Sequence, residues 1–542
     1  MNRAIPQLLA ILFLALCLSH CRDKVASPET KIIGLDNSAS AKATKDAFSV
    51  AGNFQAPSNL KFSSSSIPGF FQKYPELKVY ENDITRFYRE RAYSYAWYNE
   101  SGIIEQVNGL YSRILQMEND GLNTHIPYLA NLHALMDDND SSLLKEPMNP
   151  EAELLLTAQY FNFAKKVWQG VDEKNTKEID WFLPRKKLDL KSLMDSLLFD
   201  GNKEFIATEP VYPQYGYLKN YLKTYRELQS KGLWKPIASD KRSYRSGDSS
   251  MVVVEIKKKL YYLGDHNGDT TKALFDGELE KGVKEFQRRH GWRDDGIVGA
   301  AMLQELNTPL ESRIKQIVVN MERCRWVPSR AKSEFLLVNI PAYKLFVFEN
   351  DSLKWDMNVV VGQTMHKTAI FNGDLKYVVF SPYWNVPPSI LSKEILPGIK
   401  RDPNYLNKHN MEWNGSGVRQ KPGPPNSLGK VKFLFPNSFN IYLHDTPAKS
   451  LFGEEQRAFS HGCIRLSEPE KLATYLLRNR PEWTTEKIKA AMNSGTEKYV
   501  TLNETVPVYI AYFTSWVDKN GKINFRNDVY KRDERVAKMI LQ

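Results

Sequence analysis

Residues 335–349 read Phe-Leu-Leu-Val-Asn-Ile-Pro-Ala-Tyr-Lys-Leu-Phe-Val-Phe-Glu, which is two short runs of aliphatic and aromatic residues joined at a proline. Such runs, bounded by Pro, Gly or Asn, are typical of β-strands. The same pattern returns downstream at 357–361, 377–380, 441–444 and 506–513. Helical periodicity appears between the last two, at 469–477 and 485–492. We therefore expect residues 335–513 to form a compact β-rich domain with a few helices.

A long irregular insertion interrupts this domain at residues 385–430. It contains seven prolines with glycines between them. An insertion of this length inside a compact domain is typical of a lid or a binding loop. Because apolar residues such as Ile395, Ile399 and Leu406 give it a surface to pack on, we expect an ordered cap.

Two strings near the end of the β-rich domain carry groups for nucleophilic chemistry. Residues 444–447 read His-Asp-Thr-Pro, and residues 460–465 read Ser-His-Gly-Cys-Ile-Arg. A thiol becomes a nucleophile when it is held as a thiolate, and a nearby imidazole is the usual means. His444 ends a predicted strand and can be aimed rigidly, whereas His461 shares a face with Cys463 only on a strand. Both histidines are therefore candidates for the base.

The backbone around Cys463 also fits acyl chemistry. Gly462 permits close approach of a substrate carbonyl, and the backbone N–H groups of Cys463 and Gly462 are candidates for an oxyanion hole. Arg465 could hold the turn or a substrate carboxylate. Three alternatives stay open: an inert core thiol, a disulfide between Cys463 and Cys324, and a zinc site built from His444, His461 and Cys463. The string His-Glu-x-x-His of zinc peptidases is absent.

A smaller unit precedes the β-rich domain at residues 244–307. Two amphipathic helices are expected at 252–263 and 279–290, and glycines punctuate the turn that follows. Phe286-Gln287 and the string Asp-Gly-Ile-Val-Gly at 295–299 resemble the small three-helix peptidoglycan-binding domain. A connecting helix is expected within 308–334, with Cys324 as a buried thiol on its apolar face.

The sequence of the N-terminal half predicts a signal segment, a flexible linker and a helical domain. Residues 1–21 contain a short apolar run, 8–18, after Arg3 and end at Cys21, which resembles a bacterial lipoprotein signal whose cysteine is acylated. A plain cleaved signal and an uncleaved anchor are the alternatives. Residues 22–67 are expected to be a flexible linker, and residues 68–240 a helical scaffold. Aromatic residues of that scaffold either line a sugar groove or, as we favour, fill its core: Tyr93, Tyr95, Trp97 and Tyr98.

His444, the gap of 15 residues that follows it, and the string at 460–465 together resemble the signature of L,D-transpeptidase catalytic domains. The resemblance implies that Cys463 is the nucleophile and His444 the proton acceptor and donor. It gives His461 a supporting role, and it has the backbone carbonyl of Asp445 orient the imidazole. It also implies acylation by carbapenems and a reaction without metal or organic cofactor.

Segments 383–390, 419–424 and 428–433 resemble the large branch of this family, which combines a helical scaffold, a peptidoglycan-binding module and a capped catalytic domain. The resemblance thus implies a multidomain α+β chain with a C-terminal tail at 514–542. The implied reaction releases D-alanine from a tetrapeptide stem and joins two diaminopimelates. Candidate substrate-binding residues are Arg465, Ser460, Trp384, Arg419 and Lys432.

The chain of 542 residues has 74 Lys and Arg against 63 Asp and Glu, a net charge of +11. This excess is spread along the sequence, so it fits the carboxylates of peptide stems better than nucleic acid. The implied partners are peptidoglycan stems and glycan, a membrane reached through the N-terminus, and cell-wall synthases. The implied location is the periplasmic face of a bacterial envelope membrane. Alternative functions are an L,D-carboxypeptidase, an anchoring transferase with a protein amine as acceptor, and a non-catalytic wall-binding lipoprotein.

Overall fold

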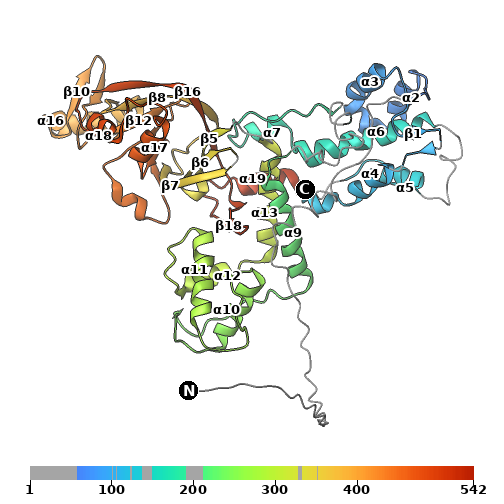
Figure 1. Ribbon diagram of the computed structural model, residues 1–542, viewed down its shortest axis with the longest axis horizontal. Coiled ribbons are helices and arrows are strands. Elements are labelled where there is room, and N and C mark those ends of the chain that lie inside the picture. The colour runs from blue at the N-terminus through green and yellow to red at the C-terminus, as the bar shows by residue number, and fades with distance from the viewer. Residues whose placement is uncertain are drawn as a thin grey trace, which may run out of the picture.

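The computed structural model describes residues 58–541, apart from gaps at 101, 105, 123–124, 137–148, 191–193, 195–210, 328–332 and 351. The expected signal segment with Cys21, and most of the expected linker, lie outside the described residues. Three bodies meet at two long helices that pack side by side, α9 (Gln214–Ser230) and α13 (Leu310–Trp326), as Figure 1 shows. This is the expected multidomain α+β architecture.

The first body is helical and is organised around α6 (Pro150–Ala164). Thirteen of the fifteen residues of α6 are buried, so this helix is the centre of the core rather than an amphipathic surface helix. Asn149 caps it by accepting a hydrogen bond from the Glu151 N–H, and Pro150 opens its first turn. The surrounding elements are α2 (Ser66–Lys73), α3 (Glu81–Glu90), β1 (Tyr98–Asn99), β2 (Gly102–Ile103), α4 (Gln106–Leu115), α5 (Leu129–Met136) and α7 (Glu173–Lys177).

The aromatic residues of this body fill its core. Tyr95, Trp97 and Tyr98 are buried, and the Trp97 indole donates a hydrogen bond to the Thr157 hydroxyl. The expected linker was drawn too long, because Phe62 and Ile67 are buried in the same core and α2 already begins at residue 66. The helical body therefore starts several residues earlier than expected.

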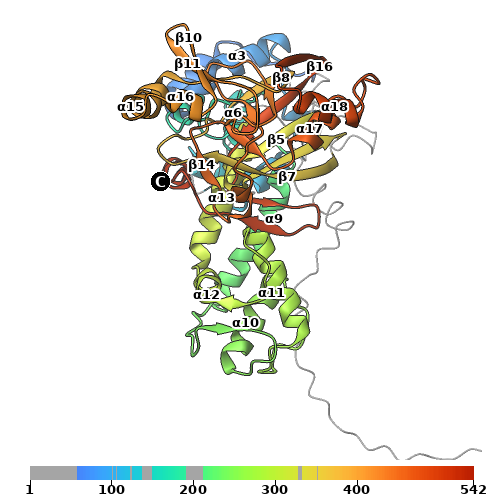
Figure 2. The same cartoon turned by 90° about the vertical axis from the view of Figure 1, so that its left-hand side faces the viewer.

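The second body is the three-helix module, which lies below the other two in Figure 2. Its helices are α10 (Met251–Tyr262), α11 (Gly277–His290) and α12 (Ala300–Leu306), and β3 (Ser243–Tyr244) pairs with β4 (Val298–Gly299). Ser250 and Asp276 cap α10 and α11 through their side chains. Thirteen buried residues form a core separate from that of the other bodies, so the module is a small domain in its own right.

The third body is built on a nine-stranded sheet of order β14-β7-β15-β13-β12-β8-β16-β5-β6, which closes on itself because β6 also pairs with β7. The expected strands are present, although β16 begins eight residues earlier than expected and β13 is only two residues long. The bounds are β5 (Glu334–Asn339), β6 (Lys344–Glu349), β7 (Ser352–Gly362), β8 (Asn372–Phe380), β12 (Val431–Leu434), β13 (Leu443–His444), β14 (Ala458–Ser460), β15 (Ile464–Leu466) and β16 (Lys498–Ala511). Two helices, α17 (Pro469–Leu476) and α18 (Thr485–Met492), add to it.

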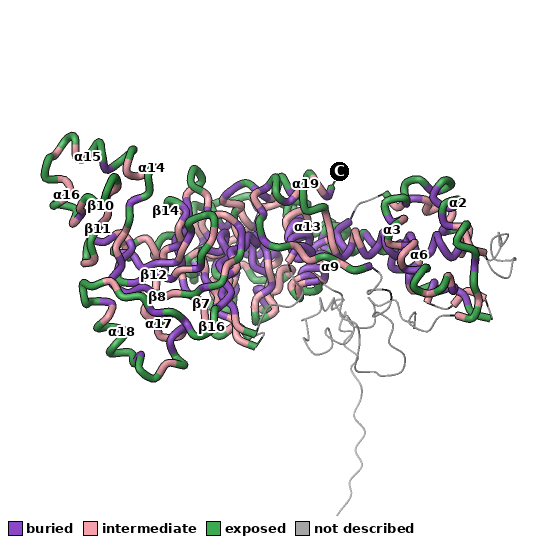
Figure 3. The backbone as a smooth tube through the Cα atoms, turned by 90° about the horizontal axis from the view of Figure 1, so that it is seen from above, coloured by how far each residue is buried: buried purple, intermediate pink, exposed green. Residues whose placement is uncertain are grey.

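The insertion at 385–430 folds into a small unit with its own apolar cluster, formed by Val386, Ile395, Met411 and Val418. It lies at the end of the molecule opposite the helical body in Figure 3. Strand β11 (Gly417–Gln420) pairs with β10 (Met411–Asn414) and with β9 (Trp384–Asn385), which ties the insertion to its point of entry. Its helical elements are α14 (Pro388–Ile390), α15 (Leu396–Arg401) and α16 (Tyr405–Lys408).

The segment expected to be a C-terminal tail is part of the packed structure. It forms β17 (Ser515–Val517), β18 (Ile523–Phe525) and α19 (Asp533–Ile540), and Val517, Phe525 and Val536 are buried in the main core. This segment contacts α9, α11 and α13, so it joins the three bodies where they meet. Every helix within the described ranges is too short or too polar to cross a bilayer.

Candidate active site

The register of the sheet places the candidate residues beside one another. His444 on β13 is opposite Arg465 on β15 and opposite Lys432 on β12. Directly paired residues share a face of the sheet, and residues two apart on a strand do so as well. The Ile464 N–H donates to the Tyr442 carbonyl. Cys463 therefore lies beside Tyr442 at the N-terminal ends of the parallel strands β13 and β15. Cys463 and Tyr442 therefore extend the row of His444 and Arg465.

The His444 imidazole is oriented by its neighbour in the chain. Its Nδ1 lies 2.5 Å from the backbone carbonyl oxygen of Asp445. Because a carbonyl can only accept a hydrogen bond, Nδ1 carries the proton and the lone pair is on Nε2. His444 is therefore set up to accept a proton at Nε2.

Asp445 is itself held on several sides. Its carboxylate accepts a hydrogen bond from the Lys430 N–H at 2.8 Å and pairs with Lys449 at 2.6 Å. The backbone of Gly429, at φ +61°, lies against the Asp445 side chain. A Cβ atom at this position would lie 2.4 Å from that side chain, so only glycine fits. The Asp445 carbonyl, which orients His444, therefore lies in a loop that several contacts hold in place.

The turn before Cys463 is closed by Ser460. Its hydroxyl donates to the Cys463 carbonyl at 2.5 Å and accepts from the Gly462 N–H at 3.1 Å. Gly462 has φ +116°, a conformation that favours glycine, and its carbonyl accepts from the Thr368 hydroxyl at 2.8 Å. The expectation that the Gly462 N–H lines an oxyanion hole is wrong in this geometry, because that N–H is already used by Ser460. Ser460 positions the nucleophile turn.

Tyr442 is a site residue that the sequence analysis missed. It acts to lower the pKa of the Cys463 thiol, and its ring lies edge-on to the His444 ring with centroids 5.7 Å apart. The Cys463 thiol also reaches the Asn440 carbonyl at 3.7 Å. The available signal was strand alternation, since Tyr442 precedes His444 by two residues and so shares its face.

The reactive pair rests in its neutral form. Burial, and then the charge of Arg465, lower the pKa of His444 to about 3. Burial raises the pKa of the Cys463 thiol, although hydrogen bonds from Tyr442 and the charge of Arg465 act against that rise. At neutral pH the site therefore holds a thiol beside a neutral imidazole rather than a thiolate beside an imidazolium.

The neutral pair predicts how Cys463 reacts with iodoacetamide as pH changes. A raised pKa means less thiolate at pH 7, so alkylation should be slow there. It should rise about tenfold per pH unit up to pH 9, as an ordinary thiol with a high pKa does. The rate is measured by peptide mapping of Cys463, with Cys463→Ala as the background. A rate already at its plateau from pH 5 upward would instead indicate a thiolate–imidazolium pair.

The other candidates fall into two groups. His461 is near the nucleophile but exposed, and it pairs at 3.4 Å with Glu394 of the insertion and stacks near His366. Arg419 and Trp384 lie on strands of the insertion, whereas Lys432 lies beside His444 on the main sheet. Arg419 is paired with Glu412 at 2.7 Å and Lys432 with Glu497 at 3.5 Å, so both charges are already balanced. Trp384 belongs to β9 and packs against the apolar cluster of the insertion.

Cys324 lies apart from this site. It is fully buried on α13, and burial raises the pKa of its thiol to about 12. Both Cys324 and Cys463 are free thiols, so the structure does not contain the disulfide considered above. Among the described residues, no group of three or more His, Cys, Asp or Glu side chains is placed to hold a metal ion.

Comparison with known protein families finds three matches along the chain. The descriptions are "L,D-transpeptidase catalytic domain" for residues 333–510, "Scaffold domain" for residues 82–222 and "Putative peptidoglycan binding domain" for residues 250–306. The chain therefore combines an L,D-transpeptidase catalytic domain, a scaffold domain and a peptidoglycan-binding domain. The resemblance drawn from the sequence is confirmed for all three.

A curated protein of Haemophilus influenzae named "Putative L,D-transpeptidase" is 33% identical over 251 residues, covering 42% of this chain and 50% of that protein. The chain thus spans about half the length of this curated relative. Solved L,D-transpeptidases are also similar. That of Stackebrandtia nassauensis is 14% identical, with 51% of this chain and 97% of that chain covered and a TM-score of 0.24. That of Mycobacterium smegmatis is 13% identical, with 33% and 58% covered and a TM-score of 0.19.

Proposed function

We propose that this chain is a cysteine-dependent L,D-transpeptidase that cross-links peptidoglycan stems. The observation that carries the proposal is the row formed by Cys463, Tyr442, His444 and Arg465 on one face of the sheet, with the lone pair of His444 Nε2 free. A thiol, a base and an orienting carbonyl are the parts that nucleophilic acyl transfer requires. The catalytic-domain match supports the reaction class.

In the first half-reaction, the Cys463 sulfur attacks the carbonyl that joins the L-centre of diaminopimelate to D-alanine, and its proton passes to His444 Nε2. Collapse of the tetrahedral adduct breaks the bond to D-alanine, whose amine leaves with the proton from His444. The stem remains on Cys463 as a thioester. The neutral resting pair suits this order, because the proton moves only as the sulfur–carbon bond forms.

In the second half-reaction, the side-chain amine of another stem attacks the thioester carbonyl while His444 takes its proton. The Cys463 sulfur leaves and regains that proton from His444. The product is an amide bond between two diaminopimelates. We assign the oxyanion to the Cys463 N–H, since the Gly462 N–H is engaged by Ser460. Arg465, beside both reacting groups, is placed to favour the anionic forms of Cys463 and the adduct.

Acylation can be tested with a carbapenem, whose strained carbonyl is attacked by the Cys463 sulfur while His444 takes the proton. We expect the intact mass of the protein to rise by one adduct, with the adduct mapped to Cys463. The Cys463→Ala protein should stay unmodified. An adduct on Cys324, or one that persists in Cys463→Ala, would contradict the assignment of the nucleophile.

We assign the insertion to a lid that favours the amine over water. Glu394 of the insertion reaches His461, two residues from the nucleophile, so the insertion approaches the reacting end of the sheet. Lids exclude water and hold substrates in place. Because Arg419 and Lys421 both pair with Glu412 inside the insertion, these charges stabilise the fold of the insertion itself.

Replacing residues 390–426 with a short Gly/Ser linker should therefore separate cross-linking from hydrolysis. Cys463 should remain reactive toward small thiol reagents, while cross-linked product falls steeply and hydrolysed product rises relative to it. The single variant Glu394→Gln is the milder companion, since it removes only the contact with His461. A trimmed protein that folds and cross-links at the parent rate and product ratio would show that the insertion is not a working lid.

The peptidoglycan-binding module supports the cell wall as the partner and a site of action outside the cytoplasm. Lipid attachment at Cys21, anchoring to a membrane and cooperation with cell-wall synthases stay predictions from the sequence. Water or a protein amine as acceptor would make the same site a carboxypeptidase or an anchoring transferase. A non-catalytic role would require an inert Cys463, which the orientation of His444 argues against.

A further inference from the structure

A cleft of about 380 Å³ lies between the three-helix module and the catalytic domain, away from the nucleophile. Its module side is the C-terminal end of α11 with Trp292. Its catalytic side is the loop after β7, the loop before β14, and the segment after β18. Its volume is within the range of pockets that hold small ligands, about 300–1,000 Å³.

The lining of this cleft has the chemistry that saccharides need. Three residues with side-chain amides line it, Gln363, Gln456 and Asn527, and the last two are exposed. An amide both donates and accepts, which matches a sugar hydroxyl or an N-acetyl group. Trp292 adds a partly exposed indole, a flat apolar surface with a polar N–H.

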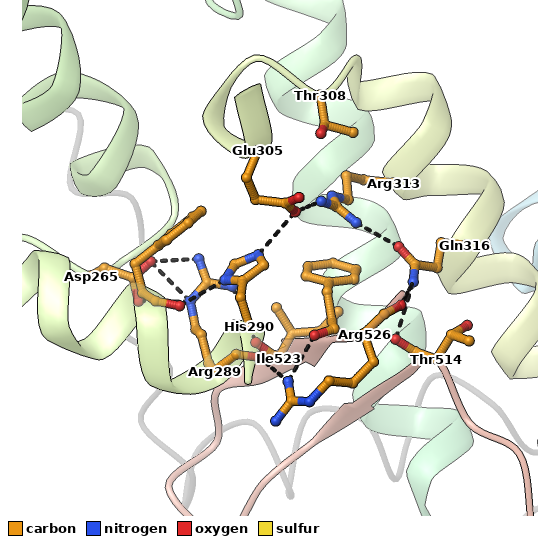
Figure 4. Close-up of polar contacts among 12 residues, drawn as sticks. Asp265, Arg289, His290, Glu305, Thr308, Arg313, Gln316, Thr514, Ile523 and Arg526 are labelled. Carbon is orange, nitrogen blue, oxygen red and sulfur yellow. Dashed lines mark hydrogen bonds and ion pairs between the residues drawn. The ribbon is translucent and has the colours of Figure 1, made fainter. Parts of the chain in front are cut away.

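The module is held in one orientation, so the cleft is already formed. Figure 4 shows the contacts that fix it. The Arg289 guanidinium pairs with Asp265 at 2.5 Å within the module and donates to the Ile523 carbonyl of β18 at 3.2 Å. In return, the Arg526 guanidinium donates to the Arg289 carbonyl at 2.6 Å.

A second set of contacts in the same interface reaches the long helix α13. Glu305 of α12 pairs with Arg313 of α13 and lies 3.4 Å from His290 Nε2. Gly291 permits the close fit, because a Cβ there would lie 2.4 Å from the Arg526 side chain. Buried, mutually paired groups of this kind fix one arrangement of two bodies, since separating them would leave charges unpaired.

The cleft is connected to the nucleophile by one short loop. Residues 363–365 line the cleft, and the Gln363 N–H donates to the Ser460 carbonyl at 2.9 Å. In the same loop, His366 stacks near His461, and Thr368 holds the Gly462 carbonyl. A ligand in the cleft therefore lies on the other side of the loop that supports the Cys463 turn.

From this geometry we propose that the cleft binds the sugar chain of peptidoglycan, so that the module and the catalytic domain together form one saccharide site. The ligand class is an uncharged oligosaccharide of N-acetylated amino sugars. The proposal rests on the proposed function for the identity of the polymer. It adds that the glycan is held at the domain junction, which delivers its stems to Cys463.

The test measures binding of glycan strands stripped of their stem peptides, by calorimetry, to the full chain carrying Cys463→Ala. We expect binding, and we expect the double variant Gln456→Ala/Asn527→Ala to weaken it by about tenfold or more. The matched control is Gln304→Ala, an exposed amide of the same module that does not line the cleft. All three proteins should melt at the same temperature, because the replaced side chains are exposed.

Absence of glycan binding, or binding that the double variant leaves unchanged, would overturn the proposal. Binding of an isolated tetrapeptide stem that depends on the same two amides would overturn it as well, because the cleft would then be a peptide site. Since the nucleophile is absent from these proteins, the outcome is independent of whether the chain cross-links stems. Failure of the proposed function and failure of this inference are thus distinguishable.

Discussion

Replacing Cys463 with alanine should abolish formation of cross-linked muropeptides, a loss of about 10⁴-fold or more in rate, while the protein stays folded. The nucleophile, base and oxyanion donor act as a unit, so without the nucleophile the other two groups give little rate enhancement. Cys463 is half-buried at the N-terminal end of β15. Its contact with Ser460 is made by its backbone carbonyl and does not involve the sulfur. The melting temperature should therefore change little. Activity is measured from purified stem substrates by mass analysis of the products.

Cys324 provides the matched control. It is the other free thiol among the described residues, fully buried on α13 and remote from the row of reacting groups. Cys324→Ala should lower stability by on the order of 1 kcal/mol through lost packing, and leave the rate of cross-linking unchanged. If Cys463→Ala retained cross-linking, or if Cys324→Ala lost it, Cys463 would not be the nucleophile.

Replacing His444 with alanine should cost nearly as much, about 10³-fold or more, because the Cys463 thiol then has a raised pKa and no base. The loss should be partly rescued at high pH in the acylation step, where solvent rather than His444 ionises the thiol. The measurement is the rate of carbapenem adduct formation from pH 7 to pH 10. The parent protein should depend on pH much less over this range, since His444 removes the proton during attack.

His461 is the control for this second prediction. It is nearer to Cys463 in sequence than His444 is, but it is exposed and contacts Glu394 and His366. His461→Ala should lower the rate modestly and should show no rescue at high pH. A His461→Ala protein that behaves like His444→Ala, with the same rescue, would mean that the assignment of the base is wrong.

The strands that the sequence predicted best are those with nearly continuous runs of apolar residues, β5 and β6. β5 and β6 were predicted within one residue at their N-terminal ends, because their apolar runs are nearly continuous. The first half of β16 was missed, since six of the eight residues 498–505 are exposed, among them Lys498, Asn503 and Glu504. The C-terminal segment was called a tail because its apolar residues are few and isolated, although three-dimensional packing buries them against α9 and α13.

The site was predictable to the extent that its residues are close in sequence. The string at 460–465 and the upstream His444 indicated the groups that we propose as nucleophile and base. Long-range pairings could not be foreseen: Lys432 was expected to be available to a substrate carboxylate, yet Glu497, 65 residues away, balances its charge. The use of the Gly462 N–H by Ser460 depends on a turn conformation that composition does not reveal. Tyr442 required the strand register, which fixes its contact with Cys463.

The cleft at the domain junction had no signal in the sequence. Trp292, Gln363, Gln456 and Asn527 are far apart along the chain and lie in four separate loops around the cleft. They come together because hydrogen bonds from Arg289 to the Ile523 carbonyl and from Arg526 to the Arg289 carbonyl hold the module against the C-terminal hairpin. A binding site of this kind depends on tertiary structure rather than on a motif.

The central claim is that Cys463 transfers a stem to an amine. The most direct test incubates the purified protein with muropeptides that carry tetrapeptide stems and analyses the products by mass. We expect dimers whose mass equals two monomers minus one D-alanine, together with an equal amount of free D-alanine. Tripeptide monomers without dimers would mean that water is the acceptor, and an unchanged mixture would mean that the chain does not act on these stems. Either result would contradict the account.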